Sequence, residues 1–154
     1  MFNILIQIVL SYLLGSISGS LLMGKFKGGV DIRKLGSGNA GGTNAYRTQG
    51  TKFALAVIFI DIIKGFIPSK FISQVIFIHS ENLISLEASA VMCGLSAVVG
   101  HVYPIYYGFR GGKGAGAAIG MVVAIFPIAI IVGLSTFIVN LILTGWVGLG
   151  TILA

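Results

Sequence analysis

Five apolar stretches alternate with two short polar, glycine-rich stretches along the chain. An apolar helix needs about 20 residues to cross a bilayer, and each apolar stretch is close to that length. The pattern therefore predicts an all-α protein, a polytopic transmembrane helix bundle of about five spans. The expected spans cover residues 2–23, 53–68, 84–100, 115–134 and 135–154.

The basic residues indicate how this bundle is oriented. Those that follow the first apolar stretch and precede the second are Lys25, Lys27, Arg33, Lys34, Arg47 and Lys52. Because loops rich in Lys and Arg stay in the cytoplasm, we place residues 24–52 inside and the N-terminus outside. A cleaved signal peptide would need a basic start before its apolar run, so we expect residues 2–23 to be kept as a span.

The composition leaves too few polar residues for a water-facing surface of ordinary size. Charged residues make up 9% of the 154 residues and hydrophobic ones 56%, whereas soluble domains are about 25% charged. The formal charge of +6 suits anionic lipids or an anionic substrate. Cys93 is the single cysteine, which excludes an internal disulfide and a cysteine metal cluster. We expect one domain in the cell membrane, surrounded by membrane lipids, with no metal, cofactor or nucleic acid.

The first polar stretch, residues 36–47, is called the first block. It combines glycines with hydroxyl, carboxamide and guanidinium groups. Closely spaced glycines let successive N–H groups converge on an anion, and an arginine grips a phosphate through two parallel hydrogen bonds. The candidate binding residues are Ser37, Gly38, Asn39, Thr43 and Asn44. We expect Arg47, together with Lys113 further along the chain, to be catalytic by holding the phosphates and neutralising the developing charge.

The second block, residues 100–114, places Lys113 among Gly111, Gly112 and Gly114. Two predicted spans separate it from the first block, so both blocks should open at one membrane face. One substrate then touches both. The sequence therefore predicts a phosphate-handling site at the cytoplasmic face of the membrane.

A regular glycine row runs from the second block into the fourth predicted span. Its members recur every four residues at Gly108, Gly112, Gly116 and Gly120. Such spacing lets helix backbones touch. Part of the glycine content is therefore packing, and only Gly111, Gly112 and Gly114 are expected to line a site.

Three ionisable residues have two interpretations each. Asp61 and Lys64, three apart in the second predicted span, form either a self-contained structural pair or a functional site, and the pair is the simpler hypothesis. His101 is a general base or an interfacial histidine bonded to a loop carbonyl. No carboxylate lies near His101 in the sequence to orient its ring.

Two nucleotide-binding patterns are present only in part. Gly36-x-Gly38-x-x-Gly41 has the letters of a dinucleotide fingerprint but lies between membrane helices instead of in a βαβ unit. Gly111-Gly112-Lys113-Gly114 lacks the first glycine and the final Ser or Thr of a Walker A loop. Both nucleotide-binding functions are rejected.

The two blocks resemble two signatures of the bacterial membrane acyl-phosphate:glycerol-3-phosphate acyltransferases. The first signature is matched by Gly15-Ser16-Ile17, Asp31-Ile32-Arg33, Gly36-Ser37-Gly38-Asn39 and Thr43-Asn44-Ala45-Tyr46-Arg47. The second is matched by Gly100-His101 and Phe109-Arg110-Gly111-Gly112-Lys113-Gly114. Their order and spacing fit, so the resemblance covers essentially the whole chain.

This resemblance implies an enzyme of the cell inner membrane whose substrates are acyl phosphate and glycerol 3-phosphate. It transfers a fatty acyl group to the sn-1 hydroxyl, giving lysophosphatidic acid and phosphate in the first acylation step of phospholipid synthesis. By position, Ser37, Asn39, Thr43, Asn44, Arg47 and Lys113 would line the phosphate pocket. With no Ser-His-Asp arrangement evident, we expect direct attack by the hydroxyl, with His101, a substrate phosphate or a residue beyond this chain as base.

The chain departs from the family pattern at three places. Ser18 stands where the family has proline, and Ala115-Gly116-Ala117 stands where it has a threonine-bearing segment. The third signature has no counterpart, so we expect residues 1–154 to be a single acyltransferase domain lacking its C-terminal part. The alternatives are a membrane carrier for an organic phosphate and an inactive membrane subunit; acyl-chain preference and oligomeric state stay open.

Overall fold

The computed structural model describes residues 2–75 and 84–153, and every regular element in these ranges is a helix. The all-α prediction is confirmed. The α-helices are α1 (Phe2–Gly15), α2 (Gly19–Phe26), α3 (Gly42–Gln49), α4 (Thr51–Lys70), α5 (Leu86–Val102), α6 (Ala115–Ile125), α7 (Pro127–Thr144) and α8 (Val147–Leu153). Short 3-10 turns lie at η1 (Ile32–Lys34), η2 (Ile72–Gln74) and η3 (Ile105–Tyr107).

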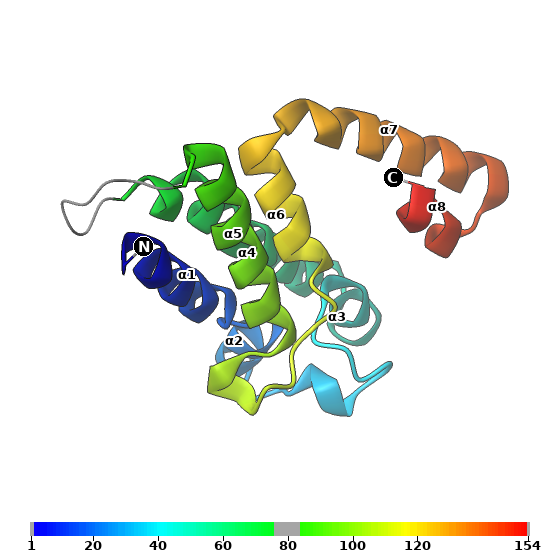
Figure 1. Cartoon of the computed structure of the whole chain (residues 1–154). Coiled ribbons are helices and arrows are strands. Elements are labelled where there is room, and N and C mark those ends of the chain that lie inside the picture. Colours follow the sequence, from blue (N-terminus) through cyan, green and yellow to red (C-terminus); the bar gives the residue numbers. More distant parts are fainter. Residues whose placement is uncertain (1, 76–83, 154) are drawn as a thin grey trace.

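Helix α4 lies at the centre of the bundle, in contact with α1, α2, α3, α5 and α6 (Figure 1). Its longest contact is with α6, and α1 packs along α5. Glycine makes the α4–α6 contact close: Gly65 lies against the backbone of Ala117, and Gly120 against the backbone of Ile62. A side chain at either position would push the two helices apart.

The first predicted span is broken in the structure. Helices α1 and α2 meet at an angle of 44°, and residues 16–18 between them are not helical. By length and composition, two of the described helical segments are able to cross a membrane, and they are Leu86–Tyr107 and α7. The number rises to three if α1 and α2 together count as one bent span. Helix α4 has 20 residues but carries four charges, at Lys52, Asp61, Lys64 and Lys70.

The predicted boundaries of the last two spans are wrong. Helix α6 ends at Ile125, and Pro127 starts α7. Proline has no N–H to continue a helix but fits its first turn. Helix α7 ends where Gly145 adopts a left-handed conformation with φ +71°, and α8 follows. Both helices lie outside the bundle of α1–α6 (Figure 1), and α7 has no buried residue.

Candidate active site

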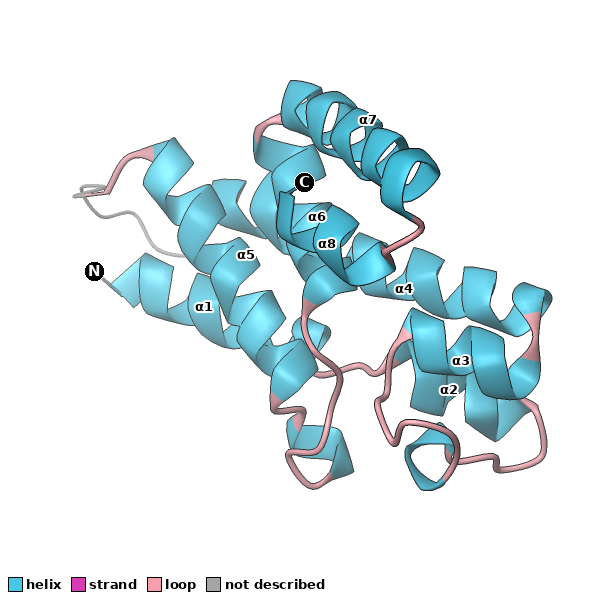
Figure 2. Cartoon of the chain, turned by 90° about the vertical axis from the view of Figure 1, so that its right-hand side faces the viewer, coloured by secondary structure: helices cyan, strands magenta, loops and turns pink. Residues whose placement is uncertain are grey.

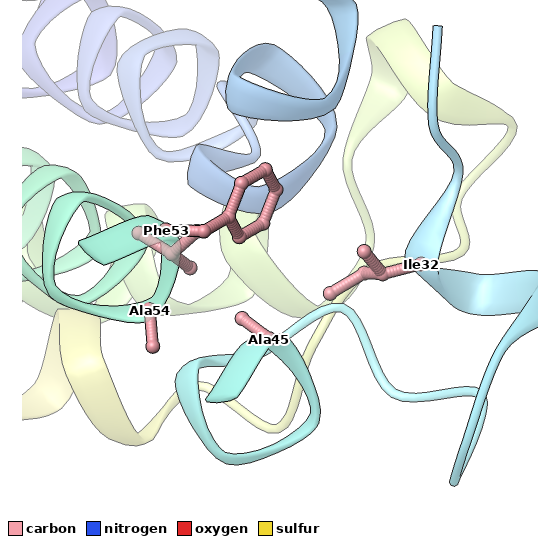
Figure 3. Close-up of a cluster of buried hydrophobic side chains, with 5 residues drawn as sticks. Ile32, Ala45, Phe53 and Ala54 are labelled. Carbon is pink, nitrogen blue, oxygen red and sulfur yellow. The ribbon is translucent and has the colours of Figure 1, made fainter. Parts of the chain in front are cut away.

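The two blocks lie at the same end of the bundle, which is the lower end in Figure 1. Figure 2 shows the same loops from the side, below α4 and α5. The first block is fixed to α4 by a small apolar core of Ile32, Ala45, Phe53, Ala54 and Val57 (Figure 3). Ile32 and Ala45 are fully buried there, so buried apolar side chains anchor both ends of the polar loop between η1 and α3.

Asn44 organises the loop of the first block. Its side chain is buried, and its Nδ2 group donates to the carbonyl oxygens of Ile32, Leu35 and Asn39 at 2.9–3.0 Å. Its Oδ1 atom accepts from the N–H of Ser37 at 3.0 Å. The amide is therefore committed to four backbone groups, which makes Asn44 a support of the loop, where the sequence had suggested a direct substrate contact.

Arg33 joins the two blocks, and the sequence analysis missed this role. Its Nη1 atom donates to the carbonyl oxygens of Tyr107 and Arg110, both at 3.0 Å. Its Nε and Nη2 atoms bond to the carboxylate of Asp31 at 3.0 and 2.9 Å, and Asp31 also caps η1. The turn before the first block is thus in direct contact with the second block, and the shared substrate stays a prediction. The spacing Asp31-x-Arg33 before a turn was the available signal.

The charges at this junction are matched. Hydrogen bonds from Arg33 hold the pKa of Asp31 below its ordinary value, against the opposing effect of burial. At neutral pH the junction therefore consists of an ionised carboxylate and a guanidinium.

The second block folds back onto the end of α5. The N–H groups of Gly111 and Gly112 donate to the carbonyl oxygens of Val102 and His101, both at 3.1 Å. These are two of the carbonyls that the end of a helix leaves without partners. Gly114, with φ +86°, then turns the chain into α6. The four-residue glycine row is thus split: Gly116 and Gly120 face α4, but Gly112 faces His101 and Gly108 faces open space.

His101 lies at the start of the second block, in the last turn of α5, and its ring faces Gly112 further along the block. Its side chain is 4% exposed, its Nδ1 atom lies 3.5 Å from Asp61 Oδ1, and its Nε2 atom faces Gly112. The sequence offered no carboxylate to orient this ring, and the structure supplies Asp61 from another helix. Asp61 also forms a 3.0 Å ion pair with Lys64, so the predicted pair is confirmed.

The remaining predicted site residues are open to solvent or line the loops. The side chains of Arg47, Lys113, Ser37 and Thr43 are exposed, and Asn39 is half-buried. Within the described residues Arg47 and Lys113 form no ion pair, which leaves both cations available for an anion. Gly38 has φ +73° and lies at the exposed turn of the first block. The direct roles of these residues stay predictions.

Comparison with known proteins gives consistent matches along the chain. A family model described as glycerol-3-phosphate acyltransferase matches residues 5–154. Glycerol-3-phosphate acyltransferases from Chlorobium phaeobacteroides (strain BS1) and Chlorobaculum parvum are 42% and 43% identical. Each match covers the whole of this chain but only 67% and 68% of the relative, so the chain spans about two thirds of these proteins.

Two solved structures share the fold. They are crystal structures of PlsY (YgiH), an integral membrane glycerol 3-phosphate acyltransferase, in its glycerol 3-phosphate and lysophosphatidic acid forms. Both are 36% identical, with TM-scores of 0.81 and 0.79, over 97% of this chain and 70% of theirs. The protein described here is an integral membrane protein with helical spans. It belongs to the glycerol-3-phosphate acyltransferase family.

Proposed function

We propose that this protein transfers a fatty acyl group from acyl phosphate to the sn-1 hydroxyl of glycerol 3-phosphate. The hydroxyl oxygen attacks the acyl carbon, the bond from that carbon to the phosphate oxygen breaks, and lysophosphatidic acid and inorganic phosphate leave. The observation that carries the proposal is the junction made by Arg33, which brings two glycine-rich blocks with unpaired cations to one end of the bundle.

Both substrates present phosphates to this end of the bundle. Arg47 and Lys113 supply positive charge, and the exposed Ser37 and Thr43 supply hydroxyl groups. The glycines of both blocks, Gly38 and Gly111–Gly114, let backbone N–H groups approach the anions closely. Positioning of two bound reactants and neutralisation of the developing negative charge are the main sources of acceleration for an already activated acyl donor.

The attacking hydroxyl must lose a proton, and this chain and its proposed substrates offer two acceptors. His101 is the residue predicted for this task, but its ring lies behind Gly112 and is 4% exposed. A general base must be within hydrogen-bond reach of the proton that it takes. The burial of His101 therefore favours an oxygen of the departing phosphate as the acceptor.

The end of the bundle that carries the blocks faces the cytoplasm in this proposal. The basic residues Lys25, Lys27, Lys34 and Lys52 flank the first block, and basic loops stay on the cytoplasmic side of the cell inner membrane. The N-terminus then lies outside. The five proposed spans are α1 with α2, then α4, α5, α6 and α7.

The test is to incubate the purified protein with acyl phosphate and glycerol 3-phosphate and to measure lysophosphatidic acid by mass spectrometry. We expect product from acyl phosphate and none from free fatty acid. Uptake of glycerol 3-phosphate into proteoliposomes without product formation would instead indicate a carrier. The absence of both product and uptake would indicate an inactive subunit. Replacing Arg47 or Lys113 by Ala should raise KM for a phosphorylated substrate at least tenfold, whereas Lys52→Ala serves as the matched control.

A further inference from the structure

The broken helix α1–α2 is held by charges from α4. Lys64 Nζ donates to the carbonyl oxygen of Ile17 at 2.7 Å, and the N–H of Gly19 donates to Asp61 Oδ1 at 3.3 Å. A helix break leaves carbonyls without partners on one side and N–H groups on the other. The ammonium group of Lys64 bonds to a carbonyl on the C-terminal side of α1, and the carboxylate of Asp61 bonds to an N–H at the start of α2. Both signs are favourable, because a cation stabilises a helix C-terminus and an anion stabilises an N-terminus.

Four helices converge on Asp61. Besides α4 itself, α2 reaches it through Gly19, α5 through His101 and α6 through Gly116. A Cβ atom at Gly19 would lie 3.0 Å from Asp61 Oδ1, and one at Gly116 would lie 2.8 Å from Asp61 Cβ. Only glycine allows both backbones to come this close to Asp61.

The contact continues from Asp61 to the second block. His101 Nδ1 faces Asp61, and on the other side of the ring Nε2 lies against Gly112, where a Cβ atom would collide with it. The N–H of Gly112 also donates to the backbone carbonyl of His101 at 3.1 Å. An uninterrupted series of contacts thus links the break in α1–α2 to the glycines beside Lys113.

Stability alone is a poor reason for this arrangement. Asp61 and Lys64 are each 3% exposed, and removing two charges from water costs about as much as, or more than, their attraction returns. Buried ionic groups serve better to select one arrangement of the elements around them. The arrangement selected here sets where the second block lies relative to the helices.

We propose that Asp61, Lys64 and His101 are positioning residues that hold the glycines of the second block in the position, relative to the helices, that phosphate binding requires. Asp61 and Lys64 hold the bend between α1 and α2, and Asp61 orients the His101 ring that supports Gly112. This inference rests on the proposed function of the second block. It assigns His101 a role that depends on Nδ1 and on the shape of the ring, not on proton transfer.

The first test removes both charges together. Asp61→Asn or Lys64→Met alone leaves a buried unpaired charge and is expected to impair folding, whereas the double variant D61N/K64M leaves none. We expect the folded double variant to show at least a tenfold higher KM for one of the phosphorylated substrates, with kcat within threefold of the wild type. Ser69→Ala is the matched control, because Ser69 is a buried polar residue of α4 outside the network. Unchanged KM values in a folded double variant would overturn the proposal.

The second test reads the position of the second block without activity. Spin labels at Lys34→Cys and Tyr106→Cys, both exposed positions, report the distance from the turn before the first block to the second block, and Cys93 is buried. We expect a narrow distance distribution in the wild-type background and a broad one with D61N/K64M. Should the wild-type chain form no lysophosphatidic acid, the proposed function fails, but this measurement still decides the positioning role; equal distributions would refute it.

The third test separates the two nitrogens of His101. His101→Asn keeps a donor at the Nδ1 position toward Asp61, and His101→Gln keeps a donor at the Nε2 position. We expect both variants to raise KM for a phosphorylated substrate at least tenfold with kcat within threefold of the wild type, because His101→Asn lacks the ring edge that faces Gly112 and His101→Gln lacks the donor toward Asp61. If both variants keep the wild-type KM, the positioning role is wrong; if kcat of either falls a hundredfold with the acidic limb of its pH profile lost, His101 acts as the base.

Discussion

The two glycine-rich blocks have similar compositions but are held in different ways. The first block contains its own support: the amide of Asn44 bonds to four backbone groups, and Asp31 caps the turn before the loop. In the second block, the described contacts that hold the glycines 111–114 come from the end of α5, including the His101 ring there, and Arg33 of the turn before the first block bonds to the neighbouring carbonyls of Tyr107 and Arg110.

The same residue types therefore have different structural roles in the two blocks. A loop that carries its own support keeps its shape when neighbouring helices shift. A loop supported from outside moves with them. We therefore expect substitutions in the first block and in the turn before it to disturb both blocks, because Arg33 of that turn bonds to the second block, and substitutions around the second block to leave the first intact.

The largest effect is expected from Asn44→Ala. It leaves three carbonyls and one N–H of the loop without their partner, at a cost of about 3 kcal/mol in the free energy of unfolding. Activity should fall below detection, since both blocks lose their register. Thermal unfolding in detergent and product formation measure the two effects. The matched variant Asn140→Ala, in α7, should change stability by less than about 0.5 kcal/mol; equal losses in the two variants would remove the distinction between the blocks.

The next effect is expected from Gly112→Ala, which acts on the second block alone. The new methyl group would collide with the His101 ring, and relief of such overpacking costs about 1–3 kcal/mol. We expect kcat/KM to fall by at least tenfold. Hydrogen-exchange rates of the backbone amides in the first block should stay unchanged. Gly108→Ala is the control, because its Cβ atom meets nothing within 4 Å. Its only cost is the left-handed backbone, about 1 kcal/mol. A larger loss in Gly108→Ala would contradict the support by His101.

A smaller effect is expected from Arg33→Lys. Lysine keeps the positive charge but lacks the branched guanidinium group that bonds to Asp31 and to the second block at the same time. Loss of the two bonds to the second block should cost about 1 kcal/mol, or about fivefold in KM for a phosphorylated substrate. Lys34→Ala removes a neighbouring charge and keeps this guanidinium group. If steady-state kinetics show that Lys34→Ala is the worse of the two, the positive charge of this turn matters more than the junction.

The smallest effect concerns pH. Arg33 lowers the pKa of Asp31 in the folded protein, so the folded state binds a proton less readily than the unfolded chain, whose Asp has a pKa of about 3.9. The stability due to this pair is present above about pH 4 and is lost as the pH falls through the lowered pKa. The difference in unfolding free energy between the wild type and Asp31→Asn should be constant from about pH 7 to 5 and shrink below about pH 4. A difference that grows on acidification would refute the pairing.

Some features of the fold were readable from local patterns. Long apolar stretches predicted the all-α class, and the glycines and cations between them predicted two blocks that meet. The error after residue 125 was avoidable, because Pro127 marks the start of a new helix. The break at residues 16–18 was not, because this part of the apolar run 2–23 is marked only by glycines and serines, which also suit helix packing.

The candidate site shows the same division. The exposure of Arg47 and Lys113 follows from the polar character of their surroundings. The role of Asn44 does not, since a carboxamide in a glycine-rich loop suits a ligand as well as it suits the backbone. The partnership of His101 with Asp61 was equally hidden, because the two residues lie in different helices.

The amino-acid sequence by itself determined the class of fold, the membrane setting, the family and the places where chemistry is concentrated. These depend on hydrophobicity, glycine content and charge, which are properties of short segments. Only the tertiary structure decided which buried polar atoms are paired: Lys64 with Ile17, Asp61 with Gly19, and Arg33 with the second block. A buried polar group must find a partner wherever the fold brings one within about 3 Å, and that partner is not encoded near it in the chain.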